Sequence, residues 1–534
     1  MAKVPDYHKL DEFQNRSRKL KEIRQLGVEP YPHQFSPTHQ LGLLSESYRD
    51  QIVAHSDDAE SGNSDFVCVA GRLILFRAMG KNAFAQIQDS TGRIQVMFNR
   101  DATEVQGYDP KALDIPQAPG PLKFIEKRID LGDLLGIEGH LFHTNKGELT
   151  IYAKKVTLLC KTLLPLPDKH SGLVDKEVRY RKRWLDLIGN SKVMETFFSR
   201  SRILKIIRDF FEEASFLEVE TPILQNIYGG AAARPFMTNF HALDQQEMYL
   251  RISLEIALKK ILVGGVPKIY EIGKVFRNEG IDKNHNPEFT LLEAYAAYWD
   301  YNDMMVFVEN LFEKLAIAMY GSTKVPFGEE GEDCYHLIEM KAPWPRLTMK
   351  ESISKFTGVD VDQLSDEEIR LMLRETKRIG EKKLSSLPRG LLISALFEER
   401  VEHLLLDPHH ITDHPIETTP LCKLHRDPME RKKGIVERFE SFIMGQEICN
   451  AYSELNDPEE QRELLVKQAE QKEAGDDEAN PLDEEFIEAI CQGMPPAGGI
   501  GIGIDRLVML FTNMQSIRDV LYFPFMKHCS DDDS

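Results

Sequence analysis

Hydrophobic and polar residues alternate with a period of two over much of residues 66–164, which is typical of β-strands with one buried face. Turn residues interrupt the alternation, most clearly at Ser90-Thr91-Gly92 and Asn145-Lys146-Gly147. The five alternating runs are VCVAGRLILF, AFAQIQD, GRIQVMFN, DLLGIEGHLFHT and ELTIYAKKVTLL. Five short strands in this length predict a small closed barrel, and the five-stranded OB-type barrel is the most economical candidate. Phe98 lies in one of these strands and is expected in its core.

The segment before the barrel has a helical pattern instead. Apolar side chains recur at helical spacing over residues 9–26 among basic ones, and Gly27 follows. This predicts an amphipathic helix whose basic face is either solvated or in contact with nucleic acid. The polar stretch HSDDAESGNSD at 55–65 is expected to be a linker.

Beyond the barrel the pattern becomes mixed. Ile203, Ile207, Phe210 and Phe211 recur at helical spacing, and FLEVETP then alternates like a strand. The regular strand-helix alternation of a parallel sheet is missing, so we expect one large α+β domain. The predicted division is 1–60 for the N-terminal helix and linker, 61–167 for the barrel and 168–534 for the large domain.

Net charge at first argues against a nucleic-acid partner, because 66 Lys and Arg face 86 Asp and Glu, giving −20 over 534 residues. The acidity is local, however. Residues 454–488 hold 14 acidic and 3 basic side chains, whereas residues 66–165 hold 13 basic and 10 acidic ones. The barrel is therefore compatible with a nucleic-acid ligand, and the acidic side chains gather elsewhere.

The chain has no sequence signal for a membrane or an oxidising compartment. The start, MAKVPDYHKLDEF, lacks the apolar core of a signal peptide, and no run of about 18 apolar residues occurs. The seven cysteines are widely spaced and never form CxxC, which predicts reduced, mostly buried thiols. We expect a cytoplasmic protein without a membrane segment.

Several common site types are absent from the sequence. It contains no P-loop, no GxGxxG and no HExxH motif. The stretch DPHHITDHP at 407–415 offers His409, His410, Asp413 and His414 as metal ligands, but its polar, proline-flanked character favours an ordinary loop.

Functional side chains concentrate first in FRNEGIDKNHNPEFTLLEAYAAY, residues 276–298. This segment places Arg277, Glu279, His285, Phe289 and Glu293 around a short loop. A guanidinium for a phosphate, a hydrogen-bonding carboxylate and an aromatic plane for a base would suit a nucleotide site without a P-loop. The alternative is a hairpin with surface salt bridges.

Two later segments extend this set. In RFESFIMGQEICNAYSELNDPEE, Glu440 and Glu447 flank a strand break at Met444-Gly445, and such a carboxylate pair suits a magnesium ion that also holds phosphates. In GGIGIGIDRLVMLF, glycines would allow a ligand to approach the backbone, and Arg506 could reach a phosphate or a base. Solvated carboxylates and a tightly packed strand-helix joint are the alternatives.

Three stretches resemble the three motifs of class II aminoacyl-tRNA synthetases, at about 196–222, 270–298 and 498–511. The segments GGAAARPF, LRISLE, YSELNDP and GDDEA, with the barrel strands, resemble the class II lysyl-tRNA synthetases in particular. The resemblance extends from about residue 9 to 527, and the absence of a long basic extension before the barrel indicates the bacterial type.

The resemblance implies a class II catalytic domain built on an antiparallel sheet flanked by helices, and an anticodon-binding OB barrel. The family activates L-lysine with ATP to lysyl-adenylate and pyrophosphate, and then transfers lysine to the 3′ end of tRNA(Lys). Its chemistry depends on Mg²⁺, and its first motif builds a homodimer interface.

The resemblance also implies roles for individual residues. Arg277 and Arg506 are the expected catalytic residues, and Glu440 and Glu447 the expected metal ligands. The expected ATP-binding residues are Arg277, Glu279, His285, Asn286, Phe289, Glu440, Gly501 and Arg506. The expected lysine-binding residues are Gly230, Glu255, Glu293, Tyr295, Asn450, Tyr452 and Glu454. The expected anticodon-binding residues are Arg77, Phe84 and Gln95.

A physical argument also supports specificity for lysine. A lysine ammonium taken out of water must be paired, and Glu255 and Glu454 supply carboxylates, whereas an aspartate pocket would need cations. One departure from the family is Cys449-Asn450-Ala451-Tyr452, where Gly-Asn-Gly-Phe is usual, and it predicts a narrower pocket.

Two other functions are compatible with parts of the sequence. A protein lysylase paralogue shares the catalytic domain but lacks the barrel that this chain has. A catalytically inactive synthetase-like binding protein would not need Arg277, Glu440, Glu447 and Arg506, which are all present. Both alternatives are therefore disfavoured.

Overall fold

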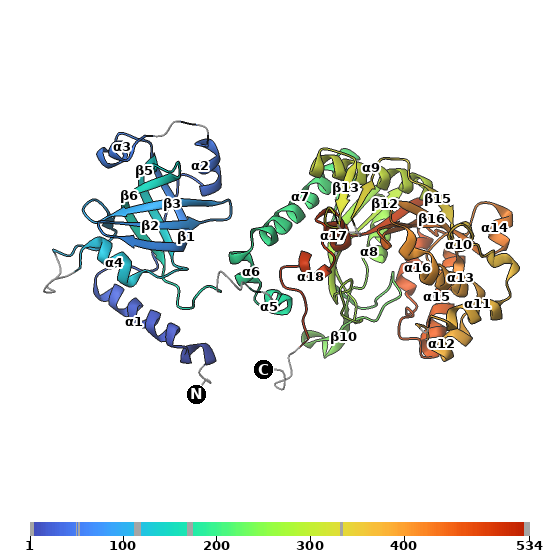
Figure 1. Ribbon diagram of the computed structural model, residues 1–534. Helices are drawn as coiled ribbons and strands as arrows, with labels where there is room; N and C mark the ends of the chain where they lie inside the picture. The colour runs from blue at the N-terminus through green and yellow to red at the C-terminus, as the bar shows by residue number, and fades with distance from the viewer. Residues whose placement is uncertain are drawn as a thin grey trace. The chain divides into compact units, whose positions relative to one another are not determined.

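The computed structural model of the chain describes residues 5–49, 51, 54–111, 119–167, 173, 175–331, 335–376 and 378–527. The chain divides into two compact units (Figure 1). The first holds the chain up to Arg179 together with Trp184–Ser191, and the second holds Tyr180–Arg183 and the chain from Lys192. Among the described helices, none is both long and apolar enough to cross a membrane.

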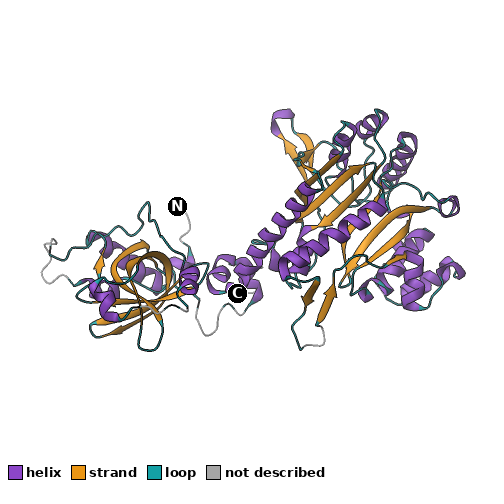
Figure 2. Cartoon of the chain, turned by 90° about the horizontal axis from the view of Figure 1, so that it is seen from above, coloured by secondary structure: helices purple, strands orange, loops and turns teal. Residues whose placement is uncertain are grey.

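The first unit is built around the predicted barrel. Its strands pair in the order β3-β2-β1-β5-β6, and β3 also pairs with β6, which closes the sheet on itself (Figure 2). The strands are β1 Phe66–Met79, β2 Asn82–Gln88, β3 Arg93–Asn99, β5 Leu134–His143 and β6 Leu149–Cys160, with a short β4, Glu104–Val105, beside β6. The five alternating runs and both predicted turns are thus confirmed, and Phe98 is fully buried in the barrel core.

Helices cover the barrel. A 3₁₀ turn, Asp6–Lys9, leads into α1, Asp11–Gln25, which is followed by Gly27 in the left-handed region at a φ of 82°. The prediction of this helix is confirmed, but one of its basic residues, Arg16, is buried and donates hydrogen bonds to Thr162 Oγ1 and to the carbonyl of Leu131. Helices α2, Leu41–Ser47, and α4, Pro121–Arg128, complete this cover.

The predicted linker at 55–65 is wrong over part of its length, because Ser56–Ser61 forms helix α3. The Asp58 carboxylate accepts a hydrogen bond from the backbone N–H of His55 at 3.2 Å and caps the helix start. Ala59 is buried against Phe142 and Tyr152 of the barrel. One small apolar residue among polar ones gives no periodic signal, which is why the pattern did not indicate a helix.

The second unit contains an eight-stranded sheet with the order β15-β16-β17-β18-β19-β12-β11-β7. The pairs are antiparallel except at the two edges, where β7–β11 and β15–β16 are parallel, so the predicted antiparallel sheet is confirmed. The strands are β7 Leu217–Glu218, β11 Lys268–Phe276, β12 Glu288–Ala297, β15 Arg346–Thr348, β16 His409–Pro415, β17 Ile435–Ile443, β18 Gln446–Ser453 and β19 Ala497–Gly503.

The predicted loop at 407–415 is wrong over residues 409–415, which form the strand β16. His410 is buried, with its ring nitrogens 2.8 Å from Ser441 Oγ and 3.1 Å from Glu309 Oε1, and His414 is buried as well. Polar side chains can occupy a core strand when neighbouring elements supply their hydrogen-bond partners. The local sequence does not show those partners. Within the described ranges, no group of three or more His, Cys, Asp or Glu side chains could hold a metal ion.

Helices pack on both faces of the sheet. On one face α7, Ser191–Glu213, α9, Tyr301–Tyr320, and α17, Ile504–Phe511, share a core with sheet residues, and Ile203, Ile207 and Phe211 are buried as predicted. On the other face lie α8, Glu255–Val263, α15, Pro458–Glu473, and α16, Glu484–Cys491. This second face carries the candidate site.

Further strands and helices are present in the described chain. Two small sheets are formed by β8 Leu224–Gln225, β10 Gln246–Leu250 and β9 Met237–Phe240, and by β13 Lys324–Phe327 with β14 His336–Glu339. The other helices are α5 Lys176–Arg181, α6 Arg183–Gly189, α10 Met349–Thr357, α11 Asp366–Arg374, α12 Glu381–Ser386, α13 Arg389–Arg400, α14 Pro428–Lys432 and α18 Ile517–Val520.

The cysteines are less buried than predicted. Among the five described, Cys422 and Cys449 are buried, Cys68 and Cys160 are half-buried, and Cys491 is exposed. All five are free thiols, and Cys334 and Cys529 lie outside the described residues.

Candidate active site

Two cross-strand rows on the sheet bring the predicted site residues together. The first row runs from β12 through β19 and β18 to β17 and consists of Glu293, Gly501, Asn450 and Glu440. The row beside it consists of Tyr295, Gly499, Tyr452 and Arg438. Side chains opposite one another in paired strands share a face, so residues more than 200 positions apart form one surface.

Two glycines are needed to keep this surface open. A Cβ at Gly499 would lie 1.9 Å from Glu454 Oε1 and 2.6 Å from Tyr295 Cε1. Gly230 has a φ of 86°, and a Cβ there would lie 2.0 Å from Ser253 Oγ. At Gly501 the nearest atom to such a Cβ would be 3.8 Å away, so Gly499, which was not among the predicted site residues, is sterically more constrained than Gly501.

Three buried carboxylates lie close together at this surface, those of Glu255, Glu293 and Glu454. Glu293 accepts hydrogen bonds from the Leu254 backbone N–H and the Tyr295 hydroxyl, both at 3.1 Å. Burial, with Glu255 adding to its effect, raises the pKa of Glu293 to about 8. Burial also raises the pKa of Glu454, and the ammonium of Lys259 beside it opposes that shift. Glu293 is therefore the carboxyl that holds a proton at neutral pH.

A buried lysine pairs with two of these carboxylates. Lys259 Nζ lies 2.5 Å from Glu255 Oε1, one helical turn away on α8, and also forms an ion pair with Glu454. Lys259 was not among the residues predicted from the sequence. The four-residue spacing from Glu255 was the available signal, but that spacing is common on exposed helix faces.

Tyr452 joins the same network, because its hydroxyl donates a hydrogen bond to Glu255 Oε1 at 2.7 Å. The expected narrowing by Cys449 is wrong, because Cys449 faces the opposite side of β18 and packs in the core with α9 and α17. Residues 449 and 452 are separated by an odd number along a strand, which places them on opposite faces.

The nucleotide residues lie at the end of the β11–β12 hairpin. Arg277 is half-buried, with its guanidinium 5.1 Å from the centre of the Phe289 ring. Burial lowers the pKa of Arg277, and Glu279, Glu447 and Glu293 oppose that shift, so these charges lie close together.

The connecting loop presents two of the predicted residues on the surface. Glu279 and His285 are exposed, and His285 Nδ1 lies 2.9 Å from Asp282 Oδ2. Asn286 is buried and structural, since its amide donates to the carbonyl of Glu288 at 2.6 Å and its Oδ1 accepts from the Phe525 N–H at 3.1 Å.

Arg506 is held beside the second predicted carboxylate. Its Nη1 donates to the carbonyl of Glu447 at 2.7 Å and lies 3.4 Å from Glu447 Oε2. The preceding residue, Asp505, anchors this helix start, because its carboxylate accepts from the Thr290 N–H at 2.7 Å and pairs with Arg200 at 2.7 Å.

The hairpin of β17 and β18 carries Glu440 and Glu447. Its two turn residues, Met444 and Gly445, both have positive φ, 54° and 65°, as the primed turns of tight hairpins require. Arg438, also missed from the sequence, donates to Glu440 Oε1 at 2.6 Å and to Asn450 Oδ1 at 3.0 Å.

Further acidic groups lie near this hairpin. Burial raises the pKa of Glu402 to about 7, and Glu398, Glu447 and Glu440 add to the shift. The field at this point of the site is thus strongly negative, as a cation site needs.

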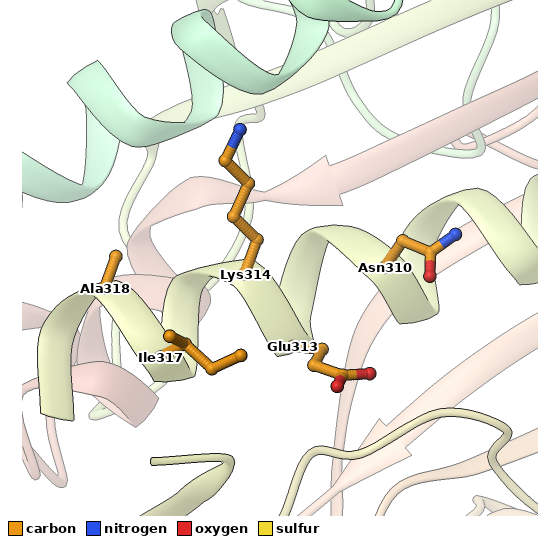
Figure 3. Close-up of a pocket in the computed structure, with 5 residues that line it drawn as sticks. All are labelled: Asn310, Glu313, Lys314, Ile317 and Ala318. Carbon is orange, nitrogen blue, oxygen red and sulfur yellow. The ribbon is translucent and has the colours of Figure 1, made fainter. Parts of the chain in front are cut away.

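Two hollows are present near the sheet. A cleft of about 960 Å³ is lined by Trp299, Arg426, Glu437 and α15, and it reaches Glu454. A shallow hollow of about 350 Å³ lies on α9, where Lys314 points toward α7 and pairs with Glu213 at 2.5 Å, while Glu313 points away from it (Figure 3). The second hollow contains none of the predicted site residues.

The predicted anticodon residues share one face of the barrel. Arg77 pairs with Phe84 across β1 and β2, and Gln86, two residues from Phe84, pairs with Gln95 on β3. Arg77 is exposed, Phe84 is half-buried beside Met97, and Gln95 donates to Thr150 Oγ1 at 2.9 Å.

The fold and the site define a class of enzyme. The family described as tRNA synthetases class II (D, K and N) matches residues 175–527, and the OB-fold nucleic acid binding domain family matches residues 67–159. The catalytic unit is thus that of a class II tRNA synthetase, with a nucleic-acid-binding barrel before it.

Comparison with individual proteins narrows this class. The chain is 57% identical to a Lysine--tRNA ligase from Chlamydia caviae, over 98% of each chain. It is 44% identical to a Lysine--tRNA ligase from Staphylococcus epidermidis, over 97% of this chain and 98% of the other. The chain belongs to the lysine--tRNA ligase family, and its sequence resemblance to that family is confirmed.

Proposed function

We propose that this protein is a lysine--tRNA ligase that activates L-lysine with ATP to lysyl-adenylate and pyrophosphate, and then transfers lysine to the 3′ end of tRNA(Lys). The observation that carries the proposal is the cluster of buried carboxylates beside the nucleotide residues on one sheet face. Full-length identity to lysine--tRNA ligases supports it.

The lysine pocket consists of Gly230, Glu255, Glu293, Tyr295, Asn450, Tyr452 and Glu454. Buried carboxylates favour a ligand that brings an ammonium group, because an unpaired buried charge is costly. Glu255, Glu454 and Tyr295 bind the ε-amino end, while Gly230, Asn450 and Tyr452 frame the rest. An aspartate side chain would meet like charges in this pocket and be rejected.

ATP binds along the β11–β12 hairpin and β19. Arg277 pairs with the α-phosphate, Glu279 binds the adenine amino group and Phe289 stacks on the base. His285 and Arg506 contact the distal phosphates or the ring, with Asn286 and Gly501 nearby. The lysine carboxylate attacks the α-phosphorus and pyrophosphate leaves, so these residues act by positioning the reactants and neutralising charge.

Glu440 and Glu447 are the residues that would hold Mg²⁺. Two carboxylates fit this ion, which usually keeps one or two protein ligands and completes its shell with phosphates and water. The proximity of Glu398 and Glu402 supports a cation at this point. The bound ion would neutralise the phosphate charges.

The barrel, residues 61–167, binds the anticodon of tRNA(Lys), and residues 168–534 form the catalytic domain. Phe84 stacks on an anticodon base, while Arg77 and Gln95 contact base edges. We also propose a homodimer built through the first motif, near which Leu217, Ile223 and Leu224 are exposed, and a cytoplasmic location.

Replacement of one pocket carboxylate tests this function. In Glu454→Gln the ammonium of lysine loses its charged partner, and we expect lysine-dependent ATP-pyrophosphate exchange and charging of tRNA(Lys) to be abolished. The matched control is Glu459→Gln, an exposed glutamate on α15, which should keep both activities. Unchanged exchange in Glu454→Gln would contradict the assignment, and a folded wild type that charges no tRNA would favour an inactive binding protein.

A further inference from the structure

A lysine of the chain itself lies beside two carboxylates of the proposed lysine pocket. Lys259 is fully buried, and its ammonium contacts the carboxylates of Glu255 and Glu454. It also lies 5.6 Å from the ring centre of Tyr452 and 6.0 Å from that of Phe486 on α16. Its stem therefore enters from the covered side of α8, and the ammonium is held between helix and sheet.

This ammonium is a permanent charge of the pocket. Burial alone would lower the pKa of Lys259, but Glu255 and Glu454 outweigh burial and raise it above its ordinary value. The aromatic rings exclude water from it and favour the cation. Removal of a buried partner from such a pair leaves the other charge uncompensated, which is strongly unfavourable.

Further ionisable groups surround Lys259 and its two carboxylate partners. The other ionisable groups facing the cluster are Glu293, Tyr295, Tyr452, Cys422, Arg277, Arg438 and Glu437, and Glu437 is paired with Arg426. Burial raises the pKa values of the two tyrosines, Cys422 and Glu293, so these groups are neutral at pH 7. Arg438 is paired with Glu440, and Arg277 lies at the nucleotide end.

Before a ligand binds, when Glu293 is still protonated, Glu255, Glu454 and Lys259 thus leave one excess negative charge when both carboxylates are ionised. Free lysine, with two ammonium groups and one carboxylate, has one excess positive charge. We infer that Lys259 is a specificity-determining residue, an internal counter-ion that sets the pocket to accept a ligand with one excess positive charge. It acts through Glu255 and Glu454 and need not touch the substrate.

Without Lys259 the pocket would have two excess negative charges and would favour a ligand with two excess positive ones. Lysinamide is such a ligand, because an amide replaces its carboxylate. The inference rests on the proposed lysine pocket. Measurements on the wild type distinguish failure of the pocket from failure of the inference. A wild type that neither binds lysine nor exchanges pyrophosphate with it would contradict the pocket itself, whatever the variants do.

The experiment compares the dissociation constants of lysine and lysinamide by calorimetry in the full chain. In Lys259→Met we expect weaker lysine binding and a shift of the lysine-to-lysinamide preference toward lysinamide by about tenfold or more, as for charge complementarity at other buried sites. The matched control is Lys260→Met, the next residue of α8, whose ammonium forms a surface pair with Glu485 at 2.8 Å. Its preference should equal that of the wild type.

Two further variants separate charge from packing. Lys259→Gln keeps hydrogen-bond donors without the charge and should show the same shift as Lys259→Met. The double variant Lys259→Met/Glu454→Gln removes one charge of each sign and should return the preference toward that of the wild type, although both ligands bind more weakly. Folding of this double variant where the single variants do not fold would support the charge balance.

An equal loss of affinity for lysine and lysinamide in both Lys259→Met and Lys259→Gln would show that Lys259 serves only packing. That result would overturn the inference. Failure of all three variants to fold would also overturn it, because Lys259 would then serve folding and not the choice of ligand.

Discussion

At the scale of single residues, the protonated carboxyl of Glu293 makes lysine binding sensitive to pH. Its pKa of about 8 in the empty pocket means that it is neutral at pH 7, whereas a cationic ligand favours its ionised form. Binding therefore releases a proton, and affinity should rise with pH. We expect the KM for lysine in pyrophosphate exchange to fall by up to about tenfold per unit between pH 6 and 8. The KM for ATP, measured alongside, is the control, and a flat lysine profile would contradict this account.

The same carboxyl should cost the empty protein stability. Its folded pKa lies above the ordinary value of 4.5, so its favourable contribution is complete below pH 4.5 and is lost as pH rises to 8. Glu293→Gln removes this dependence, and we expect the variant to be more stable than the wild type by about 3 kcal/mol at pH 8, with a smaller difference at pH 5. Thermal unfolding at both pH values measures it, and equal differences would contradict the prediction.

Lys259 and Arg438 could not be predicted from the sequence alone. Glu440, Glu447 and Arg506 could be predicted as site residues because they lie in recognisable motifs. Lys259 and Arg438 act on partners brought together by pairing of distant strands, Lys259 with Glu454 and Arg438 with Asn450. A local pattern cannot contain such a partnership.

At the scale of elements, the small residues of β19 make room for the carboxylates. In Gly499→Ala the new methyl group would collide with Glu454 Oε1, and a central strand cannot move away from its two neighbours. We expect the KM for lysine to rise by about 100-fold or more, since a displaced ligand group costs at least about 3 kcal/mol. Gly280→Ala, in a loop position with open space, is the control. An unchanged KM in Gly499→Ala would contradict the steric role of this glycine.

The elements themselves were predictable where one face is buried and the other is not. The barrel strands alternate clearly, and turn residues bound them, so their number and their turns were found. Strand β16 was missed because both of its faces are covered, His410 and His414 included, which removes the alternation. Helix α3 was missed because a single buried alanine stabilises it.

At the scale of the whole molecule, substitutions in the barrel and in the catalytic unit should affect different activities. Phe84 lies in the first compact unit, apart from the residues that activate lysine. We expect Phe84→Ala to lower kcat/KM for tRNA charging by about 10- to 100-fold, the effect of one lost base stack, and to leave tRNA-independent pyrophosphate exchange unchanged.

The matched control is Phe66→Ala, an exposed phenylalanine of the same barrel that packs on His140. Loss of pyrophosphate exchange in Phe84→Ala, or an equal loss of charging in Phe66→Ala, would contradict a specific role for Phe84. Whole-chain charge would not have suggested this test, because the acidic residues gather in 454–488 and conceal the basic balance of the barrel.

The position of β19 has a consequence for biosynthesis. Strands β11 and β12 are connected to β17 and β18 only through β19, whose residues 497–503 are among the last of the sheet to be made. Until β19 has left the ribosome, the sheet lacks the strand that pairs with both β12 and β18 and places Glu293 in one row with Asn450 and Glu440. We therefore expect a chain that ends before Ala497 to lack an aligned reaction centre and to be inactive.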